Sequence, residues 1–309
     1  MESQHRSVLL EEWLSFLEDQ PLSTVLDLTV GAGGHAAAVL EAHPEIERFI
    51  AVDQDQSALE LAKERLKPWK KVTFVRDNFA HLSQILKDAS VESVDAILID
   101  LGVSSMQLDR PERGFSFLRE GPLDMRMDQE AGLTAQEIVN HWSEEELGRV
   151  FRDYGEEKLW KRAARLLVQA REEKEFETTR DLIEALQPLE RAKKKRDHHP
   201  MTLIFQGLRI AVNSELEVIR RVLPHAIEVL RPGGILGVIS FHSLEDRIVK
   251  KLFQHEASDK QDTRGLAGLF LEKEPTIKLL TKKPVVAKEE EIQMNPRSRS
   301  AKLRVVEKR

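Results

Sequence analysis

A glycine-rich stretch near the N-terminus has the residue types that hold a nucleotide-like cofactor. Gly31-Ala32-Gly33-Gly34-His35-Ala36 follows an apolar run, opens a helical pattern and satisfies G-x-G-x-x-G/A. Asp53 lies 22 residues after Gly31, at the end of the next apolar run. A carboxylate at that place can accept hydrogen bonds from both hydroxyls of a ribose. These residues alone are compatible with a nicotinamide-dependent dehydrogenase.

Asp27 separates two classes of cofactor enzyme. It lies inside the preceding apolar run, four residues before Gly31. A carboxylate there would repel the anionic pyrophosphate of a dinucleotide, whereas it would attract the cationic methionine part of S-adenosylmethionine. The spacing resembles that of class I S-adenosylmethionine methyltransferases, and so does Arg231-Pro232-Gly233-Gly234 before a later apolar run. Methyltransferase is therefore favoured over dehydrogenase, and a glycine turn without a ligand is the third alternative.

Asp100 could serve the chemistry of a conjugated amine. It ends an apolar run, in Asp100-Leu101-Gly102-Val103-Ser104-Ser105. The lone pair of an exocyclic base amine is delocalised into the ring, and a hydrogen-bond acceptor helps that nitrogen to attack a methyl group in line. Amine methyltransferases place D/N/S-P-P-Y/F here, but this chain lacks both prolines and the aromatic residue. A ring that stacks on the base must then come from elsewhere, with three candidates: Phe115, Phe117 and Phe241.

The elements that position these acids follow an alternating order. Short β-branched runs predict buried strands at residues 24–30, 49–53, 72–76 and 94–100. Helical spacing between them predicts helices at residues 34–43, 56–66 and 80–87. This order predicts an α/β fold with a mostly parallel sheet, covered by helices on both faces. The ligand crevice of such a sheet lies at the carboxyl ends of the strands, where Asp53 and Asp100 are expected.

The chain is longer than this sheet requires. Gly233, just before the next predicted strand at 235–241, lies 133 positions after Asp100, while a strand–helix–strand crossover needs about 30 residues. Charged helical patterns fill the interval. We therefore predict a helical insertion at residues 105–205, which recognises the substrate and divides the sheet domain into residues 1–104 and 206–309. A last strand is expected at 302–307, paired with residues 284–287, and residues 255–300 are expected to form loops.

Composition excludes several classes of protein. The 309 residues carry 47 Lys and Arg against 53 Asp and Glu, so a nucleic acid would have to be held by local basic clusters. The absence of cysteine excludes thiolate metal sites and the thiolate nucleophile of a cytosine-C5 methyltransferase. No metal is expected either, because His198, His199 and His242 lack ligand spacing. We see no signal peptide or membrane-spanning run, and expect a cytoplasmic protein.

Long motifs along almost the whole chain resemble one family. They are HRSVLLEE (5–12), ERGFSF (112–117), GPLDMRM (121–127), YGEE (154–157), FQGLRIAVNSE (205–215), SFHSLEDRIVK (240–250) and NPRSRSA (295–301). The chain is similar to the MraW/RsmH family, the bacterial 16S ribosomal RNA cytosine-N4 methyltransferases. The resemblance implies a class I methyltransferase sheet with an inserted helical domain and S-adenosyl-L-methionine as cofactor. The implied substrate is a cytidine in the decoding region of 16S ribosomal RNA, within the small ribosomal subunit.

The resemblance also implies which residues bind the cofactor. They are Gly33, Gly34, His35, Asp53, Phe79, Asp100 and Gln107. To these the strand pattern adds Asp27, near the methionine part, and Asp100 is also the expected catalytic acceptor for the amine. Phe79 follows the third strand, where an adenine commonly packs. Each residue has a simpler alternative: Asp53 could cap a helix, Phe79 could be core, and His35 could be an ordinary helix-start residue.

Two basic clusters are the candidates for RNA binding. One lies in the insertion and contains Lys193, Lys194, Lys195 and Arg196; the other includes Arg297, Arg299, Lys302 and Arg304. Their alternative is an ordinary solvated surface. A nicotinamide oxidoreductase and a non-catalytic RNA-binding relative remain as other functional classes, although a relative without activity should have lost Asp27, Asp53 or Asp100. No membrane partner is expected, and the sequence leaves the oligomeric state open, a homodimer included.

Overall fold

The computed structural model describes residues 7–191, 200–262 and 270–309. The chain divides into two compact units: residues 1–102 with 216–309, here called the sheet unit, and residues 103–215, here called the helical unit. The predicted boundaries were 105 and 205. The helical unit continues to Glu215 because α10 (Pro200–Asn213) buries Ile204, Phe205 and Leu208 in this unit's core.

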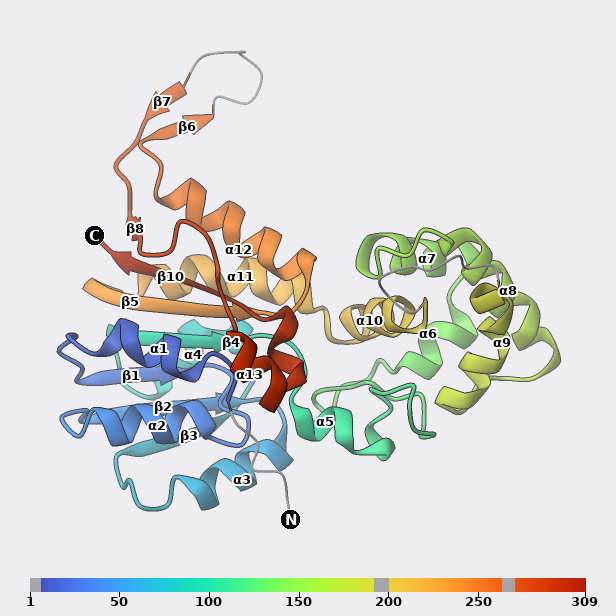
Figure 1. Ribbon diagram of the computed structural model, residues 1–309, viewed down its shortest axis with the longest axis horizontal. Helices are drawn as coiled ribbons and strands as arrows, with labels where there is room; N and C mark the ends of the chain where they lie inside the picture. The colour runs from blue at the N-terminus through green and yellow to red at the C-terminus, as the bar shows by residue number, and fades with distance from the viewer. Residues whose placement is uncertain (1–6, 192–199, 263–269) are drawn as a thin grey trace. The chain divides into compact units, whose positions relative to one another are not determined.

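The sheet unit contains a mixed sheet with strand order β3-β2-β1-β4-β5-β10-β8, and β9 also pairs with β10 (Figure 1). Strands β1 to β5 are parallel, and β10 runs antiparallel to β5, β8 and β9. Their bounds are β1 Thr24–Asp27, β2 Arg48–Asp53, β3 Val72–Arg76, β4 Val94–Asp100, β5 Leu230–Ser240, β8 Ile277–Leu279, β9 Val285–Val286 and β10 Lys302–Lys308. The six predicted strands and the pairing of the last one with residues 285–286 are confirmed.

Helices cover the parallel strands because these strands are apolar on both faces. Every residue of β4 except Asp100 is buried, for example. The helices of this unit are α1 Leu10–Leu17, α2 Gly34–Ala42, α3 Gln56–Arg65, α4 Leu82–Asp88, α11 Glu215–Glu228, α12 Ser243–Glu256 and α13 Glu289–Met294. Helices α1, α2 and α3 share one apolar core with the sheet. Gly237 of β5 has no space for a side chain because Trp13 of α1 packs against it.

The helical unit has its own apolar core. Its helices are α5 Ser105–Asp109, α6 Ala135–His141, α7 Glu144–Arg149, α8 Trp160–Glu173, α9 Thr179–Arg191 and α10. Ser104, Thr134 and Ser143 start α5, α6 and α7 with capping boxes, which satisfy backbone donors at each helix start. Helices α6 to α9 lie in the interval where the sequence showed charged helical patterns, so the prediction of a helical insertion is confirmed. Among the described residues, no helix is long and apolar enough to cross a membrane.

The expectation of loops at residues 255–300 was wrong in part. This stretch contains α13, β8, β9 and a hairpin of β6 (Lys260–Asp262) and β7 (Phe270–Glu272). These strands are two or three residues long, so they carry no period that a sequence pattern could reveal. They form because β10 and the partner strand of the hairpin supply the hydrogen bonds.

Candidate active site

Three carboxylates gather at the carboxyl edge of the sheet. The register pairs Asp27 of β1 with Ala51 of β2 and Leu98 of β4. Asp53 and Asp100 therefore lie two residues beyond Asp27, on the strands to either side of it. Adjacent strands lie about 4.8 Å apart, so these two outer acids are separated by roughly 10 Å. The carboxyl edge thus has acids on three adjacent strands, and a cofactor crevice at this edge stays a prediction of the fold.

The glycine loop crosses this edge immediately after β1. Gly31 and Gly33 have φ values of +53° and +78°, in the left-handed region that a glycine adopts without steric cost. Gly34 opens α2, and a side chain there would collide with the hydroxyl of Ser7. The loop therefore brings backbone close to the crevice, while the need for glycine at position 34 comes from packing of the N-terminal segment.

Asp53 holds the glycine loop in place. Its Oδ2 accepts a hydrogen bond from the Gly31 N–H at 2.9 Å, and its Oδ1 accepts one from the Asp55 N–H at 2.9 Å. Removal from bulk water raises the pKa of Asp53 to about 6, and these backbone donors oppose the rise. Each carboxylate oxygen has two acceptor positions, so both can still accept a ligand hydroxyl. Asp55, and not Asp53, caps α3, since its side chain accepts from the Ser57 N–H.

Asp27 is buried more deeply than the other two acids. It is 2% exposed, and its Oδ1 accepts a hydrogen bond from the Thr29 N–H at 3.0 Å. Burial raises the pKa of Asp27 to about 7, and the negative charge of Asp53 adds to the rise. Asp27, a buried acid with one backbone donor and a negative neighbour, has no counter-ion in the part of the chain that the structure describes. A cationic ligand in this crevice would supply one.

Asp100 has an oxygen available for a ligand. Its Oδ1 is buried and has no hydrogen-bond partner among the described residues, while its backbone N–H donates to Thr29 Oγ1 at 2.6 Å. Burial raises the pKa of Asp100 well above the usual range, and the charges of Asp27 and Glu245 add to this effect. A buried carboxylate oxygen without a donor is costly, so this atom indicates a place where a ligand donor belongs.

His35 lies beside Asp100 in a defined orientation. Its Nε2 is 2.9 Å from the carbonyl oxygen of Val8, which can only accept, so Nε2 donates. In the neutral ring Nδ1 then carries no proton, and it lies 3.7 Å from Asp100 Oδ2. The ring of His35 thus lies between the N-terminal segment and the third acid, and its contact with the cofactor stays a prediction.

The structure brings Phe79 to the same edge and assigns Gln107 to the other unit. Phe79 is half-buried in a 3-10 turn (Phe79–His81) after β3. Its neighbour Asn78 donates to the side chain of Gln54, next to Asp53, at 2.8 Å. Gln107 is buried in the helical unit, where its side chain accepts from the Ser104 N–H at 3.0 Å. The three acids belong to the sheet unit, so the predicted contact between Gln107 and the cofactor stays a prediction.

The predicted basic residues have different environments. Arg297 and Arg299 are exposed on a 3-10 turn (Pro296–Ser300), as a surface role requires. Arg304 does not fit: it is 7% exposed and donates to Asp246 Oδ1 at 2.7 Å, and Lys302 also lies 3.6 Å from Asp246. Arg304 lies on the central part of β10, so sequence proximity to Arg299 was misleading. The predicted cluster Lys193, Lys194, Lys195 and Arg196, with His198 and His199, lies outside the described residues.

Sequence reasoning missed two residues of the site. Thr29 connects the end of β1 to β4, since its N–H donates to Asp27 of β1 and its hydroxyl oxygen accepts from the Asp100 N–H. Glu245 is fully buried at the start of α12, accepts from the Phe241 and His242 N–H groups, and adds negative charge near Asp100. Glu245 three residues after His242 is the spacing of a capping box, which was the available signal.

The site matches one class of cofactor. An edge with three acids, all of raised pKa and one with an oxygen that has no partner among the described residues, would repel a pyrophosphate and accept a sulfonium or ammonium group with ribose hydroxyls. Together with the strand order and the antiparallel strand beside β5, it defines a class I, Rossmann-like methyltransferase that depends on S-adenosylmethionine. Residues 2–309 match the family model described as the MraW methylase family, and the chain belongs to this family.

A curated relative agrees with this assignment. Ribosomal RNA small subunit methyltransferase H of Protochlamydia amoebophila (strain UWE25) is 54% identical over 306 residues, which cover 98% of this chain and 97% of the relative. Among solved structures, an rRNA methylase from Streptococcus thermophilus is 11% identical with a TM-score of 0.43, covering 96% of this chain and 92% of that one. SMU.1697c of Streptococcus mutans, a putative methyltransferase in complex with SAH, is 12% identical with a TM-score of 0.43, covering 99% and 100%. Both TM-scores are below 0.5, so the assignment of the fold rests on the strand order and not on these two structures.

Proposed function

We propose that this protein transfers a methyl group from S-adenosylmethionine to N4 of a cytidine in the decoding region of 16S ribosomal RNA. The observation that carries the proposal is the buried, unpartnered Oδ1 of Asp100 at the edge that also has the glycine loop. The family and the ribosomal RNA methyltransferase among its relatives support the substrate class. The small ribosomal subunit in the cytoplasm is the proposed setting.

Three residues would hold the cofactor in this proposal. Asp53 accepts the ribose hydroxyls, Phe79 packs beside the adenine, and Asp27 faces the cationic methionine part. When bound, S-adenosylmethionine supplies an electrophilic methyl group on a positively charged sulfur. That charge offsets the repulsion among Asp27, Asp100 and Glu245, so both Asp27 and Asp100 become ionised.

Asp100 would act on the target amine. Its ionised Oδ1 accepts a hydrogen bond from N4 and orients the nitrogen toward the methyl carbon. N4 would take the methyl group that the bound cofactor supplies. N4 then carries one proton too many, which Asp100 accepts, with His35 Nδ1 at 3.7 Å as the next acceptor.

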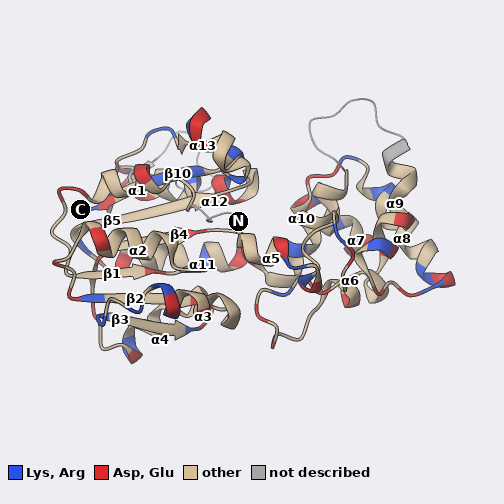
Figure 2. Ribbon diagram, turned by 60° about the horizontal axis from the view of Figure 1, so that its bottom comes forward, with Lys and Arg blue, Asp and Glu red and all other residues tan. Residues whose placement is uncertain are grey.

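The helical unit is proposed to recognise the RNA. It has its own apolar core and capped helices, so it is a folded unit. The crossover from β4 to β5 does not need an insertion of this size. The basic cluster 193–196 belongs to this proposal as a sequence prediction. Figure 2 shows Lys and Arg interspersed with Asp and Glu over both units, so local clusters must supply the contacts with phosphates.

The test replaces Asp100 by Asn, which keeps the side-chain size and removes the acceptor charge. Transfer of labelled methyl from S-adenosylmethionine to small ribosomal subunits should slow by about 100-fold or more, the range for a positioned proton acceptor. Calorimetry of cofactor binding is the second readout. A loss of affinity as large as the loss of rate would assign Asp100 to the cofactor alone, and full activity of Asp100→Asn would remove it from the mechanism. Asp77→Asn, on an acid after β3 that is partly exposed, is the matched control.

A further inference from the structure

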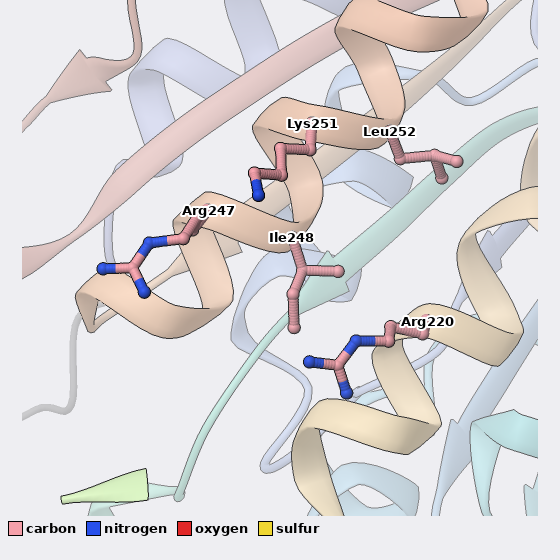
Figure 3. Close-up of a pocket in the computed structure, with 5 residues that line it drawn as sticks. All are labelled: Arg220, Arg247, Ile248, Lys251 and Leu252. Atoms are coloured by element: carbon pink, nitrogen blue, oxygen red, sulfur yellow. The ribbon is translucent and has the colours of Figure 1, made fainter. Parts of the chain in front are cut away.

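A pocket of the sheet unit opens between α11 and α12, and none of the three acids of the carboxyl edge lines it. Its volume is about 450 Å³, which is enough for a nucleotide-sized group. Arg247, Ile248, Lys251 and Leu252 extend from α12, and Arg220 reaches toward them from α11 (Figure 3). Neither the glycine loop nor any proposed cofactor residue lines it.

The pocket is positively charged. Three of its five lining residues are cations, and none is an acid. Arg220 and Lys251 are exposed and make no ion pair or hydrogen bond with the described part of the chain. Asp246, the acid next to Arg247, is engaged by Arg304 and Lys302 of β10. Arg220 and Lys251 therefore keep their positive charge available for a ligand from solution.

The pocket also has an apolar surface beneath these charges. Ile248 and Leu252 are half-buried and lie one helical turn apart on α12. In Figure 3 the side chain of Ile248 points toward Arg220, between the two helices. Cations around an apolar surface suit a ligand in which anionic groups alternate with flat or weakly polar ones. A polynucleotide strand, with its phosphates, riboses and bases, has this composition.

The fold places this pocket near the reaction edge of the same unit. Helix α12 starts directly after the carboxyl end of β5, where Ile239 pairs with Asp100 of β4. Glu245, whose charge raises the pKa of Asp100, lies in the first turn of α12, two residues before Arg247. Helix α11 precedes β5 and so also starts at this edge. The pocket residues of α12 follow in the second and third turns of a helix that begins at this edge.

We infer that the pocket binds a phosphate and the adjoining ribose or base of the substrate RNA strand, next to the nucleotide that is methylated. Arg220 presents a planar fork that can hold phosphate oxygens in pairs, Lys251 adds a point charge, and Arg247 lines the pocket beside them. Ile248 and Leu252 contact the sugar or base. This inference rests on the proposed function, because it assigns part of the RNA contact to these residues.

The test compares two double variants that remove the same charge from the same helices. R220Q/K251Q changes the pocket, and R221Q/K250Q changes the exposed residues next to each of these, which do not line it. Binding of protein-free 16S ribosomal RNA is measured between about 50 and 200 mM salt, the range in which phosphate contacts are resolved. Each single-strand phosphate contact contributes about −0.7 to the slope of log K against log salt. We expect R220Q/K251Q to reduce the slope by about 1.4 and R221Q/K250Q to leave it unchanged.

Two further measurements separate failure of this inference from failure of the proposed function. S-adenosylmethionine affinity should be the same in all three proteins, since the pocket is outside the cofactor crevice. One outcome is that the wild type methylates ribosomal RNA while both double variants keep the salt slope of the wild type. In that case the pocket is not an RNA site and the proposed function stands. If R220Q/K251Q binds protein-free RNA like the wild type but binds intact small ribosomal subunits more weakly, a ribosomal protein is the partner and the inference is wrong. A wild type that neither binds nor methylates the RNA overturns both.

Discussion

Replacing Asp27 by Asn should stabilise the cofactor-free protein at neutral and higher pH. Asp27 is buried, and its pKa is about 7 in the folded protein against about 3.9 in an unfolded chain. Below about pH 4 the side chain is protonated in both states and costs nothing. As the pH rises toward 7 the unfolded state loses the proton first, so the wild type loses stability. Three pKa units correspond to about 4 kcal/mol in the free energy of unfolding above pH 7.

Asparagine avoids this loss because it stays neutral and keeps the oxygen that accepts from the Thr29 N–H. The measurement is urea unfolding at pH 4, 6 and 8. Trp142 and Trp160 are first changed to Phe, so that Trp13 and Trp69 report on the sheet unit alone. Relative to the wild type, Asp27→Asn should gain nothing at pH 4 and about 4 kcal/mol at pH 8.

Asp95 provides a matched control on the neighbouring strand. It is also buried, but its carboxylate accepts from the Ser23 and Thr24 N–H groups and pairs with Arg231. Asp95→Asn should therefore destabilise the protein at pH 8, because it weakens a satisfied ion pair. A stability difference for Asp27→Asn that is negative at pH 8, or that does not change with pH, would refute this account of the buried acid.

Four other results are expected. The affinity for S-adenosylmethionine should rise by about 100-fold or more from pH 5 to pH 8 in calorimetry, because Asp27 must ionise to pair with the cation; a rise that is equally large in Asp27→Asn would contradict this. Asp53→Ala should weaken the same binding by about 1.5–3 kcal/mol, the range for hydrogen bonds to charged groups, and unchanged affinity would mean that the ribose binds elsewhere. Arg304→Gln should cost about 3 kcal/mol in urea unfolding, because Asp246 loses its buried partner, while the salt slope of RNA binding stays the same. Changing Lys193, Lys194 and Lys195 to Ala should reduce that slope by up to about two units; an unaltered slope would make this cluster ordinary surface.

The parallel sheet and its acids could be predicted because the relevant signals are local and strong. Buried parallel strands are continuous apolar runs, and the acids that end them mark the carboxyl edge. The glycine loop was predicted as a cofactor loop, and its φ values explain Gly31 and Gly33. Gly34 is explained by Ser7, a contact across 27 positions that no local pattern contains.

The remaining site features depend on tertiary contacts. The pKa of Asp27 results from burial and from Asp53, and the orientation of His35 results from the carbonyl group of Val8. Arg304 looked like part of a basic cluster because Arg297, Arg299 and Lys302 precede it. A buried ion pair with Asp246 cannot be seen in a run of charges. The basic pocket was missed because its residues are far apart in sequence. Arg220 and Arg247 line one pocket only after α11 and α12 pack.

The identity of the methylated nucleoside tests the central claim most directly. Small ribosomal subunits from cells that lack this protein are incubated with S-adenosylmethionine and either the wild type or Asp100→Asn, and their 16S ribosomal RNA is digested for nucleoside mass spectrometry. The account predicts that N4-methylcytidine is formed with the wild type and falls by about 100-fold or more with the variant. Methylation of a carbon atom, of another base, or of no nucleoside at all would contradict it.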